Sequence, residues 1–205
     1  MGDPEKMRKT MEMLSADVSY CEKIINDLLD YSRDIKVFPS KTSVKNLLSM
    51  SLNYVQIPEN IHINDLTEND VEVKVDKEKI VRVFDNIIKN AIDAMPGGGT
   101  LMIKSEISND TVHVSFADTG LGIPKENLEK LFTPLFTTKA QGMGLGLPIC
   151  KRIIGAHGGT ISVESIPDKG TTFRLQIPVD SRSDKDPVND RKSHRSSNAP
   201  TLGEG

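Results

Sequence analysis

The sequence predicts an α+β fold, a two-layer α/β sandwich in which helices back a mixed sheet, preceded by a long coiled-coil-like N-terminal helix. Three observations predict it. Apolar residues follow a heptad spacing through the first 33 residues. Segments with the two-residue period of strands, some consecutive as hairpins, then alternate with segments of helical period. Apolar residues almost disappear after Asp180, which predicts a disordered tail over 181–205.

The N-terminal segment, about Glu5 to Arg33, is expected to be helical. Its apolar residues recur at alternating steps of four and three: Met7, Met11, Leu14, Val18, Cys21, Ile25 and Leu28. A seam with a mean period of 3.5 residues is typical of helices that pair, so we expect a homodimer through this helix. No apolar run approaches the roughly 18 residues that a membrane span needs, so no membrane segment is expected in this chain.

Capping and turn residues set the ends of the later elements. Ser43 and Asp76 are the expected N-caps of helices over about 44–55 and 76–95. Pro96 and the three glycines after it end the second of these helices. A third helix is expected over about 144–156. Alternating strand patterns lie at 61–64, 71–75, 100–107, 111–117, 160–165 and 171–177.

Composition excludes some classes of function. The formal net charge is -3, which gives no electrostatic footprint for nucleic acid, since nucleic-acid binding calls for a basic stripe. The two cysteines, Cys21 and Cys150, lie in apolar helical segments, which predicts buried thiols rather than metal ligands. We therefore expect a soluble protein in a reducing, cytoplasmic environment.

The long helix carries a second, polar stripe. Asn86, Lys89, Asn90 and Asp93 lie at i, i+3, i+4 and i+7, on one face. Solvated faces favour Glu and Lys, and asparagine is a poor helix former. Two amides on one face therefore suggest an oxygen-ligand site, such as Mg²⁺ bridged to phosphates, with a plain solvated face as the alternative.

The stretch "DTGLGIP" begins at Asp118, directly after a predicted strand. The carboxylate of Asp118 can accept a hydrogen bond from an exocyclic amine such as that of adenine. Gly120 and Gly122 let a ligand approach the backbone closely. A tight turn is the alternative interpretation. An aspartic protease is excluded because no second such motif supplies the paired carboxylate.

A third motif consists of Gly142, Gly144 and Gly146, which precede the third predicted helix. Free backbone amides and the helix dipole favour phosphate at such an N-terminus. The spacing differs from the dinucleotide-binding fingerprint, and no Gly-Lys-Ser/Thr follows as in a Walker A loop.

Together and in this order, the motifs resemble those of the catalytic, ATP-binding domain of sensor histidine kinases, in the superfamily shared with gyrase, Hsp90 and MutL. "DNIIKNAIDAM", "DTGLGIP", "LFTPLFTTK" and "GMGLGLPIC" resemble its N, G1, F and G2 boxes. Thr137-Thr138-Lys139 is similar to the nitrogen-regulator-type variant. The resemblance covers about Lys36 to Val179. It implies a Bergerat-type catalytic domain over 36–180, after a partial dimerisation and phosphotransfer helix over 1–35.

The resemblance implies a role for each motif residue. Asn90 would ligate Mg²⁺, while Asn86 and Lys89 would contact the phosphates or the metal's shell as catalytic residues. Asp118 would bind the adenine amino group, and about 124–141 would form a lid that Phe132 and Phe136 anchor. The implied ATP-binding set is Asn86, Lys89, Asn90, Asp93, Asp118, Gly120, Gly122, Ile123, Lys139, Gly142, Met143, Gly144, Leu145, Gly146, Leu147 and Thr171.

Two departures from the family pattern bear on the reaction. Hydrolytic members place a Glu one turn before the Mg²⁺ asparagine, where this chain has Asn86, and a neutral amide is a poor general base. None of the four histidines lies in the family's acceptor motif. We therefore expect a chain that starts inside the hairpin.

The complete kinase would transfer phosphate from ATP to a histidine and then to an aspartate of a response-regulator receiver domain. An ATP-hydrolysing switch protein and a non-catalytic nucleotide-binding module remain alternatives.

Overall fold

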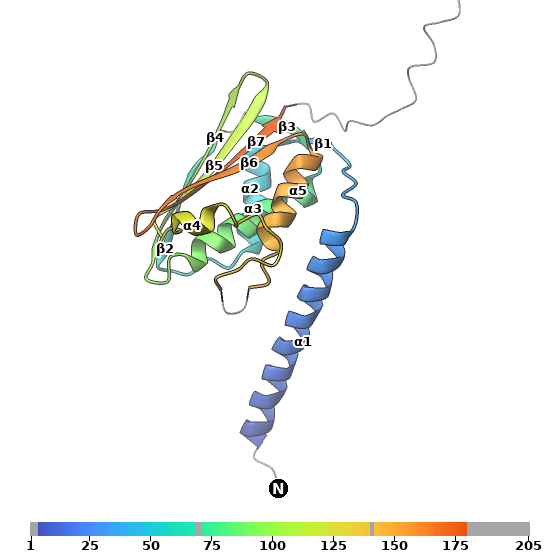
Figure 1. The fold of residues 1–205 in the computed structure, drawn as a ribbon, viewed down its shortest axis with the longest axis vertical. Coiled ribbons are helices and arrows are strands. Elements are labelled where there is room, and N and C mark those ends of the chain that lie inside the picture. The colour runs from blue at the N-terminus through green and yellow to red at the C-terminus, as the bar shows by residue number, and fades with distance from the viewer. Residues whose placement is uncertain (1–3, 69–70, 140–141, 180–205) are drawn as a thin grey trace, which may run out of the picture.

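The computed structural model describes residues 4–68, 71–139 and 142–179, so the predicted tail over 181–205 lies outside the described residues (Figure 1). The chain begins with a long helix, and helices and strands alternate after it. The helices are α1 (Pro4–Ser32), α2 (Val44–Tyr54), α3 (Lys77–Asp93), α4 (Lys125–Leu128) and α5 (Gly146–Ala156). The strands are β1 (Ser40–Ser43), β2 (Ile61–Leu66), β3 (Glu72–Val75), β4 (Gly99–Ser108), β5 (Thr111–Asp118), β6 (Thr160–Ile166) and β7 (Gly170–Pro178).

The main sheet is mixed, as predicted. Its five strands lie in the order β2-β4-β5-β7-β6, with β2 parallel to β4 and the other neighbours antiparallel. Helices α2, α3 and α5 lie along one face of this sheet (Figure 1). Strands β1 and β3 form a separate two-stranded antiparallel sheet. The expected two-layer sandwich is therefore confirmed.

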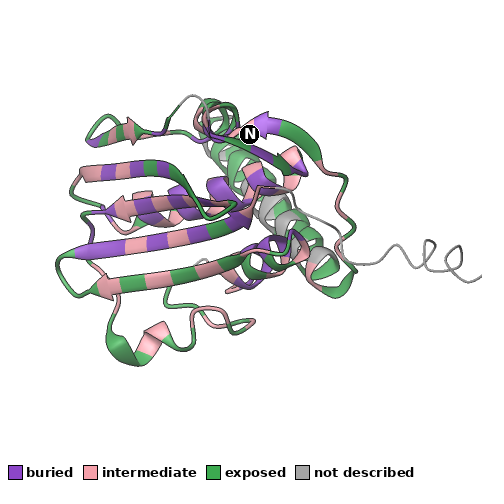
Figure 2. Ribbon diagram, turned by 90° about the horizontal axis from the view of Figure 1, so that it is seen from above, coloured by how far each residue is buried: buried purple, intermediate pink, exposed green. Residues whose placement is uncertain are grey.

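The core lies between the sheet and the helices. Strand β5 alternates strictly between buried and half-buried residues, and the central strands show this as alternating purple and pink bands in Figure 2. The rings of Phe84 on α3 and Phe116 on β5 meet edge to face, with centroids 5.1 Å apart. The apolar stripe predicted on α3 is wholly buried: Ile80, Phe84, Ile87, Ala91 and Met95.

Local interactions explain where the helices begin. The Ser43 hydroxyl accepts from the Asn46 amide at 3.1 Å, and the Asp76 carboxylate accepts from the Lys79 amide at 3.2 Å. Both predicted N-caps are thus confirmed. Helix α5 starts at Gly146 rather than near residue 144, because Gly144 has a φ of 65°, which a right-handed helix does not allow. Strand β1 and helix α4 were not predicted, since each has only four residues.

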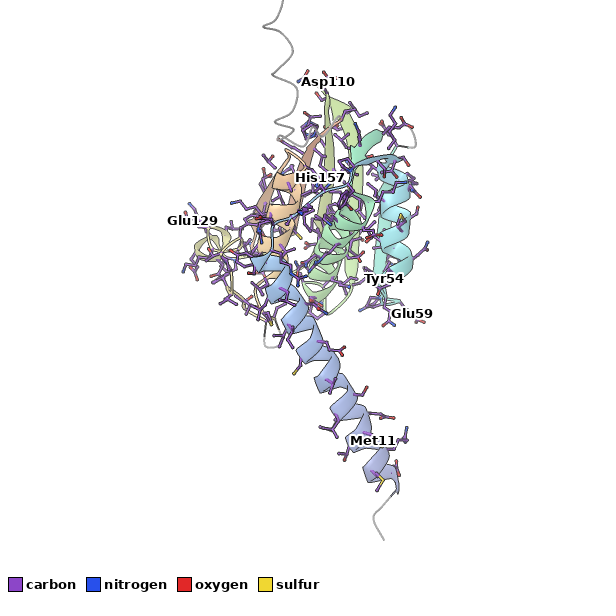
Figure 3. All side chains as sticks on the ribbon, turned by 90° about the vertical axis from the view of Figure 1, so that its right-hand side faces the viewer. Met11, Tyr54, Glu59, Asp110, Glu129 and His157 are labelled. Carbon is purple, nitrogen blue, oxygen red and sulfur yellow. The ribbon has the colours of Figure 1, made fainter. Side chains whose placement is uncertain are left out.

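His157, at the end of α5, connects this helix to the start of α3. Figure 3 shows it in the interior of the domain. Its side chain is fully buried, its Nε2 accepts from the Asp76 amide at 3.0 Å, and its Nδ1 lies 2.8 Å from the Ile153 carbonyl oxygen. Burial lowers the pKa of His157, so the ring stays neutral, with Nδ1–H as the donor. This histidine is a structural residue.

Helix α1 extends well beyond the sandwich (Figures 1 and 3), and Figure 3 labels Met11 on its outer part. The seam residues are exposed in this single chain: Met7, Met11, Leu14, Val18, Cys21, Ile25 and Leu28. The expectation of a buried thiol is therefore wrong for Cys21 and correct for Cys150. Heptad spacing alone could not distinguish burial within one chain from burial against a partner.

The two thiols are expected to react at very different rates. Burial raises the pKa of Cys150 to about 12, so it carries almost no thiolate at neutral pH. Cys21 is exposed and should react with an aromatic disulfide reagent within minutes. One thiol per chain should titrate in buffer, and the second should appear only in denaturant. Slower reaction of Cys21 with rising protein concentration would report pairing of α1, and two fast thiols would contradict the described core.

Candidate functional site

The structure brings the three sequence motifs to one cavity of about 740 Å³. Helix α3 forms one wall, and the segments after β5 and before α5 form much of the rest. Of the sixteen residues that the sequence predicted for ATP binding, fifteen line this cavity and Gly120 does not. Gly120 lies beside it, where a Cβ would stand 2.5 Å from the Ala94 carbonyl oxygen.

Asp118 is the last residue of β5 and lies at one end of the motif set. Its carboxylate is largely buried, and its Oδ1 accepts from the amides of Gly120 at 2.9 Å and Thr171 at 3.2 Å. Burial raises the pKa of Asp118 above 3.8, and the two amide hydrogen bonds oppose that rise. The carboxyl group is thus held in one orientation by amides from the loop after β5 and from β7, and Asp118 lines the cavity.

Hydroxyl groups support the same end of the cavity from β6 and β7. The hydroxyls of Ser165 and Thr171 lie 2.9 Å apart, and Ser165 Oγ accepts from the Ile123 amide at 2.8 Å. Gly122, with a φ of 67°, passes so close to β6 that a Cβ would stand 2.2 Å from the Ile166 carbonyl oxygen. Close backbone approach therefore explains the glycine at position 122.

The other end lies at Asn86 of the polar stripe, about 12 Å along α3 from Ala94, which Gly120 contacts. The Asn90 amide donates from Nδ2 to Asn86 Oδ1 at 3.2 Å. The first residue of α5, Gly146, lies directly against this pair, because a Cβ there would stand 2.5 Å from Asn86 Nδ2. The N-terminus of α5, where backbone N–H groups lack partners within the helix, thus meets the two asparagines.

Lys139 connects the predicted lid to the same stripe. Its Nζ lies 2.7 Å from Asn90 Oδ1 and 2.7 Å from Asp93 Oδ2. Both charged side chains are about half exposed, so this ion pair contributes little to folding. The ammonium position shows that Asn90 Oδ1 and Asp93 Oδ2 converge on a place that suits a cation.

The two phenylalanines of the lid have different surroundings. Phe132 packs against the core, with the Lys151 ammonium 5.4 Å from its ring centroid, a position that suits the expected role as lid anchor. Phe136 lines the cavity, and its expected role as a lid anchor stays a prediction. Its neighbour Leu135 has a φ of 64° and donates its amide to the Gly144 carbonyl oxygen at 3.1 Å.

Sequence reasoning missed several residues that line the cavity. Arg82 lies one turn before Asn86 on α3, so extending the polar stripe by four positions would have found it. Asp85 also lines the cavity, and its Oδ1 accepts from the Ser51 hydroxyl of α2. Ile24 reaches the cavity from α1, a tertiary contact that no local sequence pattern predicts.

Comparison with known proteins gives the family. Residues 75–181 match the model of the histidine kinase-, DNA gyrase B- and HSP90-like ATPase family, which is about half of the chain. The sensor histidine kinase ZraS of Escherichia coli O157:H7 is 33% identical over 172 residues, covering 82% of this chain and 38% of ZraS. The sensor histidine kinase WalK of Bacillus subtilis is 32% identical, covering 80% of this chain and 29% of WalK.

Solved structures give the same result. The catalytic domain of histidine kinase ThkA superimposes with a TM-score of 0.64 at 37% identity, over 70% of this chain and 97% of that domain. ThkA in complex with the response regulator protein TrrA gives a TM-score of 0.72 at 33% identity, over 87% of this chain and 53% of ThkA.

The chain belongs to this ATPase family, as the catalytic domain of a sensor histidine kinase of two-component signalling. Membership of the family implies ATP binding. The chain spans about 38% of the length of ZraS. Within the described part of the chain, no helix has both the length and the apolar character needed to cross a bilayer.

Proposed function

We propose that this chain binds ATP with Mg²⁺ in the cavity and transfers the γ-phosphate to a histidine on a helical hairpin. The observation that carries the proposal is the convergence of the three motifs on that cavity. Asp118 lies at one end, and the Asn86–Asn90 pair meets the N-terminus of α5 at the other. A nucleotide needs a base-recognising group and a phosphate-binding group in such an arrangement.

At the base end, Asp118 would accept from the adenine amino group. Its Oδ1 already receives the amides of Gly120 and Thr171, so Oδ2 is the oxygen we assign to the base. Ile123 and Met143, which line the same cavity, would supply apolar contact. The rest of the predicted set contributes backbone around the phosphates: Gly142, Gly144, Leu145, Gly146 and Leu147.

The residues at the other end fit Mg²⁺. Asn90 Oδ1 is the ligand we propose, and it already contacts the ammonium of Lys139, a cation. The described residues hold no cluster of three His, Cys, Asp or Glu side chains, so the remaining ligands would be phosphate and water oxygens, which Mg²⁺ commonly uses. When bound, Mg²⁺ would neutralise charge on the transferring phosphate. Asn86 and Lys89 would orient the phosphates, and Lys139 would follow them as the lid closes.

Asn86 favours transfer to histidine over hydrolysis. Its amide lies beside Asn90 at the phosphate end but cannot take a proton from water. Asn86→Glu is therefore expected to raise ATP hydrolysis by the chain alone by about 100-fold or more, since general-base catalysis contributes about 100- to 10,000-fold. Phosphate release with Mg²⁺ and ATP measures this rate, and Asn86→Gln is the matched neutral control. Fast hydrolysis by the native chain, unchanged in Asn86→Glu, would contradict the proposed role.

The remaining proposals concern assembly. The exposed seam of α1 would pair with a second copy, giving a homodimer in which residues 1–35 belong to the dimerisation and phosphotransfer hairpin and 36–180 form the catalytic domain. A response-regulator receiver domain would be the onward partner, by analogy with the ThkA–TrrA complex. The formal net charge of -3 gives no basis for proposing nucleic-acid binding. We place this domain in the cytoplasm.

The function is tested with Mg²⁺ and γ-labelled ATP, with the chain alone and with an added histidine-bearing hairpin. We expect label on the hairpin that is lost in acid and kept in base, as for a phosphohistidine. Fast phosphate release without protein label would favour an ATP-hydrolysing switch. Nucleotide binding with neither label nor release would favour a non-catalytic binding module.

A further inference from the structure

One arginine of the catalytic domain holds the C-terminal end of α1. The guanidinium of Arg152, on α5, donates from Nη1 to the Tyr31 carbonyl oxygen and from Nη2 to the Arg33 carbonyl oxygen at 2.7 Å. It also stacks on the Tyr31 ring, 5.2 Å from the ring centroid. Helix α1 has no basic residue in its own last turn, so Arg152 supplies the cation that a helix C-terminus favours.

A second contact lies further along α1. Ile24 lines the same cavity as Arg82 and Asn86. Tyr31 follows Ile24 by seven positions, which is a rise of about 10 Å along α1. Arg152 follows Gly146 by six positions, which is a rise of about 9 Å along α5. The end of α1 therefore runs parallel to α5, with Tyr31 beside Arg152 and Ile24 beside the cavity. Figure 1 shows the last turns of α1 next to α5.

The docked face of α1 differs from its heptad seam. Ile24 and Tyr31 are one heptad apart and half buried, so they share an edge of the helix. The seam residues Ile25 and Leu28 are 56% and 46% exposed and lie on the adjoining face. A partner helix can therefore occupy the seam while α1 stays docked on its own catalytic domain.

We propose that Arg152 is a positioning residue that keeps α1 docked beside the cavity, and that this docked arrangement is a resting state. The inference rests on the proposed phosphoryl transfer. An acceptor nitrogen must come within about 3.5 Å of the γ-phosphate. In the docked arrangement α1 presents Ile24 to the cavity, an aliphatic side chain without a nucleophile. When the Arg152 contact is released, the catalytic domain can turn so that its cavity faces an acceptor histidine.

The test of docking needs no nucleotide and uses the chain's own cysteines. A maleimide dye will attach to exposed Cys21 and not to buried Cys150. Cys21 is exposed and belongs to the seam, so the dye replaces none of the docking contacts of Ile24 and Tyr31. Arg152→Met is expected to lower the time-resolved anisotropy of the dye, because α1 then moves independently. Arg152→Lys should give an intermediate value, since an ammonium reaches one carbonyl but cannot form the planar pair of bonds.

Lys151→Met is the matched control, because it removes the same charge from the next residue of α5, which faces the Phe132 ring instead. Its anisotropy should equal that of the native chain. An unchanged anisotropy in Arg152→Met, or an equal fall in Lys151→Met, would overturn the docking role.

The resting-state part is tested by the rate of label transfer to the added hairpin. We expect Arg152→Met to transfer at least threefold faster with an unchanged KM for ATP, because no atom of Arg152 is assigned to the nucleotide. An equal or slower rate, with lowered anisotropy, would overturn the resting state. Absence of label with every variant would count against the proposed function instead, and the anisotropy would still decide whether Arg152 docks α1.

Discussion

Asp118→Asn is expected to lower the affinity for ATP by about 10- to 100-fold while leaving the fold intact. The substituted amide keeps an oxygen that can accept from the Gly120 and Thr171 amides, so the local structure should survive. Its nitrogen would then face the adenine amino group, donor against donor. A hydrogen bond to a buried charged group contributes about 1.5–3 kcal/mol, which sets the expected range.

Isothermal titration with ATP and with a 6-oxopurine triphosphate would measure this effect. The native chain should prefer ATP, and Asp118→Asn should lose most of that preference, because its amide nitrogen can donate to a 6-oxo group. Equal loss of both nucleotides, together with a lowered melting temperature, would show a folding defect. Unchanged ATP affinity in a folded variant would contradict the assignment of Asp118 to the base.

Because the pKa of Asp118 is raised, we also expect the affinity for ATP to depend on pH. Only the ionised carboxylate accepts through both oxygens, so ATP affinity should fall as pH decreases through the folded-state pKa of Asp118, which lies above 3.8. Asp118→Asn has no such group, so its weaker binding should lack this component. An identical acid dependence in both proteins would assign the titration to another group, such as the phosphates of ATP.

Much of the fold could be predicted because local patterns and tertiary packing agree. The stripe from Ile80 to Met95 has helical spacing, and the structure buries it against the sheet. Ser43 and Asp76 cap their helices through side-chain bonds within three residues, which a sequence displays directly. The glycines at 120, 122 and 146 mark places where another part of the backbone or a functional amide approaches closely.

The features that could not be predicted depend on contacts between segments far apart in the chain. Strand β1, with the sequence Ser-Lys-Thr-Ser, has no apolar alternation and is a strand only because β3 pairs with it. Ile24 and Arg152 are ordinary helical residues until α1 and α5 lie side by side. The exposure of Cys21 depends on whether α1 has a partner.

Gly146→Ala is the second substitution with a large expected effect, and it should act on the site rather than on the fold. A Cβ at this position would stand 2.5 Å from Asn86 Nδ2 and 2.6 Å from Asn86 Oδ1, closer than real Cβ atoms come. The backbone at Gly146 is helical, so alanine itself is tolerated there. The Asn86 amide must therefore move, which breaks its 3.2 Å hydrogen bond from Asn90.

We expect Gly146→Ala to reduce phosphoryl transfer to the added hairpin by about 100-fold, since a misplacement of about 1 Å can cost that much. Gly155→Ala is the control on the same helix, because a Cβ there meets nothing within 4 Å. It should keep full activity and raise stability by up to about 1 kcal/mol, as alanine does in a helix interior. Transfer rates and thermal melts of both variants separate the two effects. If Gly146→Ala kept native transfer, the contact between α5 and Asn86 would have no part in the reaction, and the phosphate end would have to be assigned to other residues of the cavity.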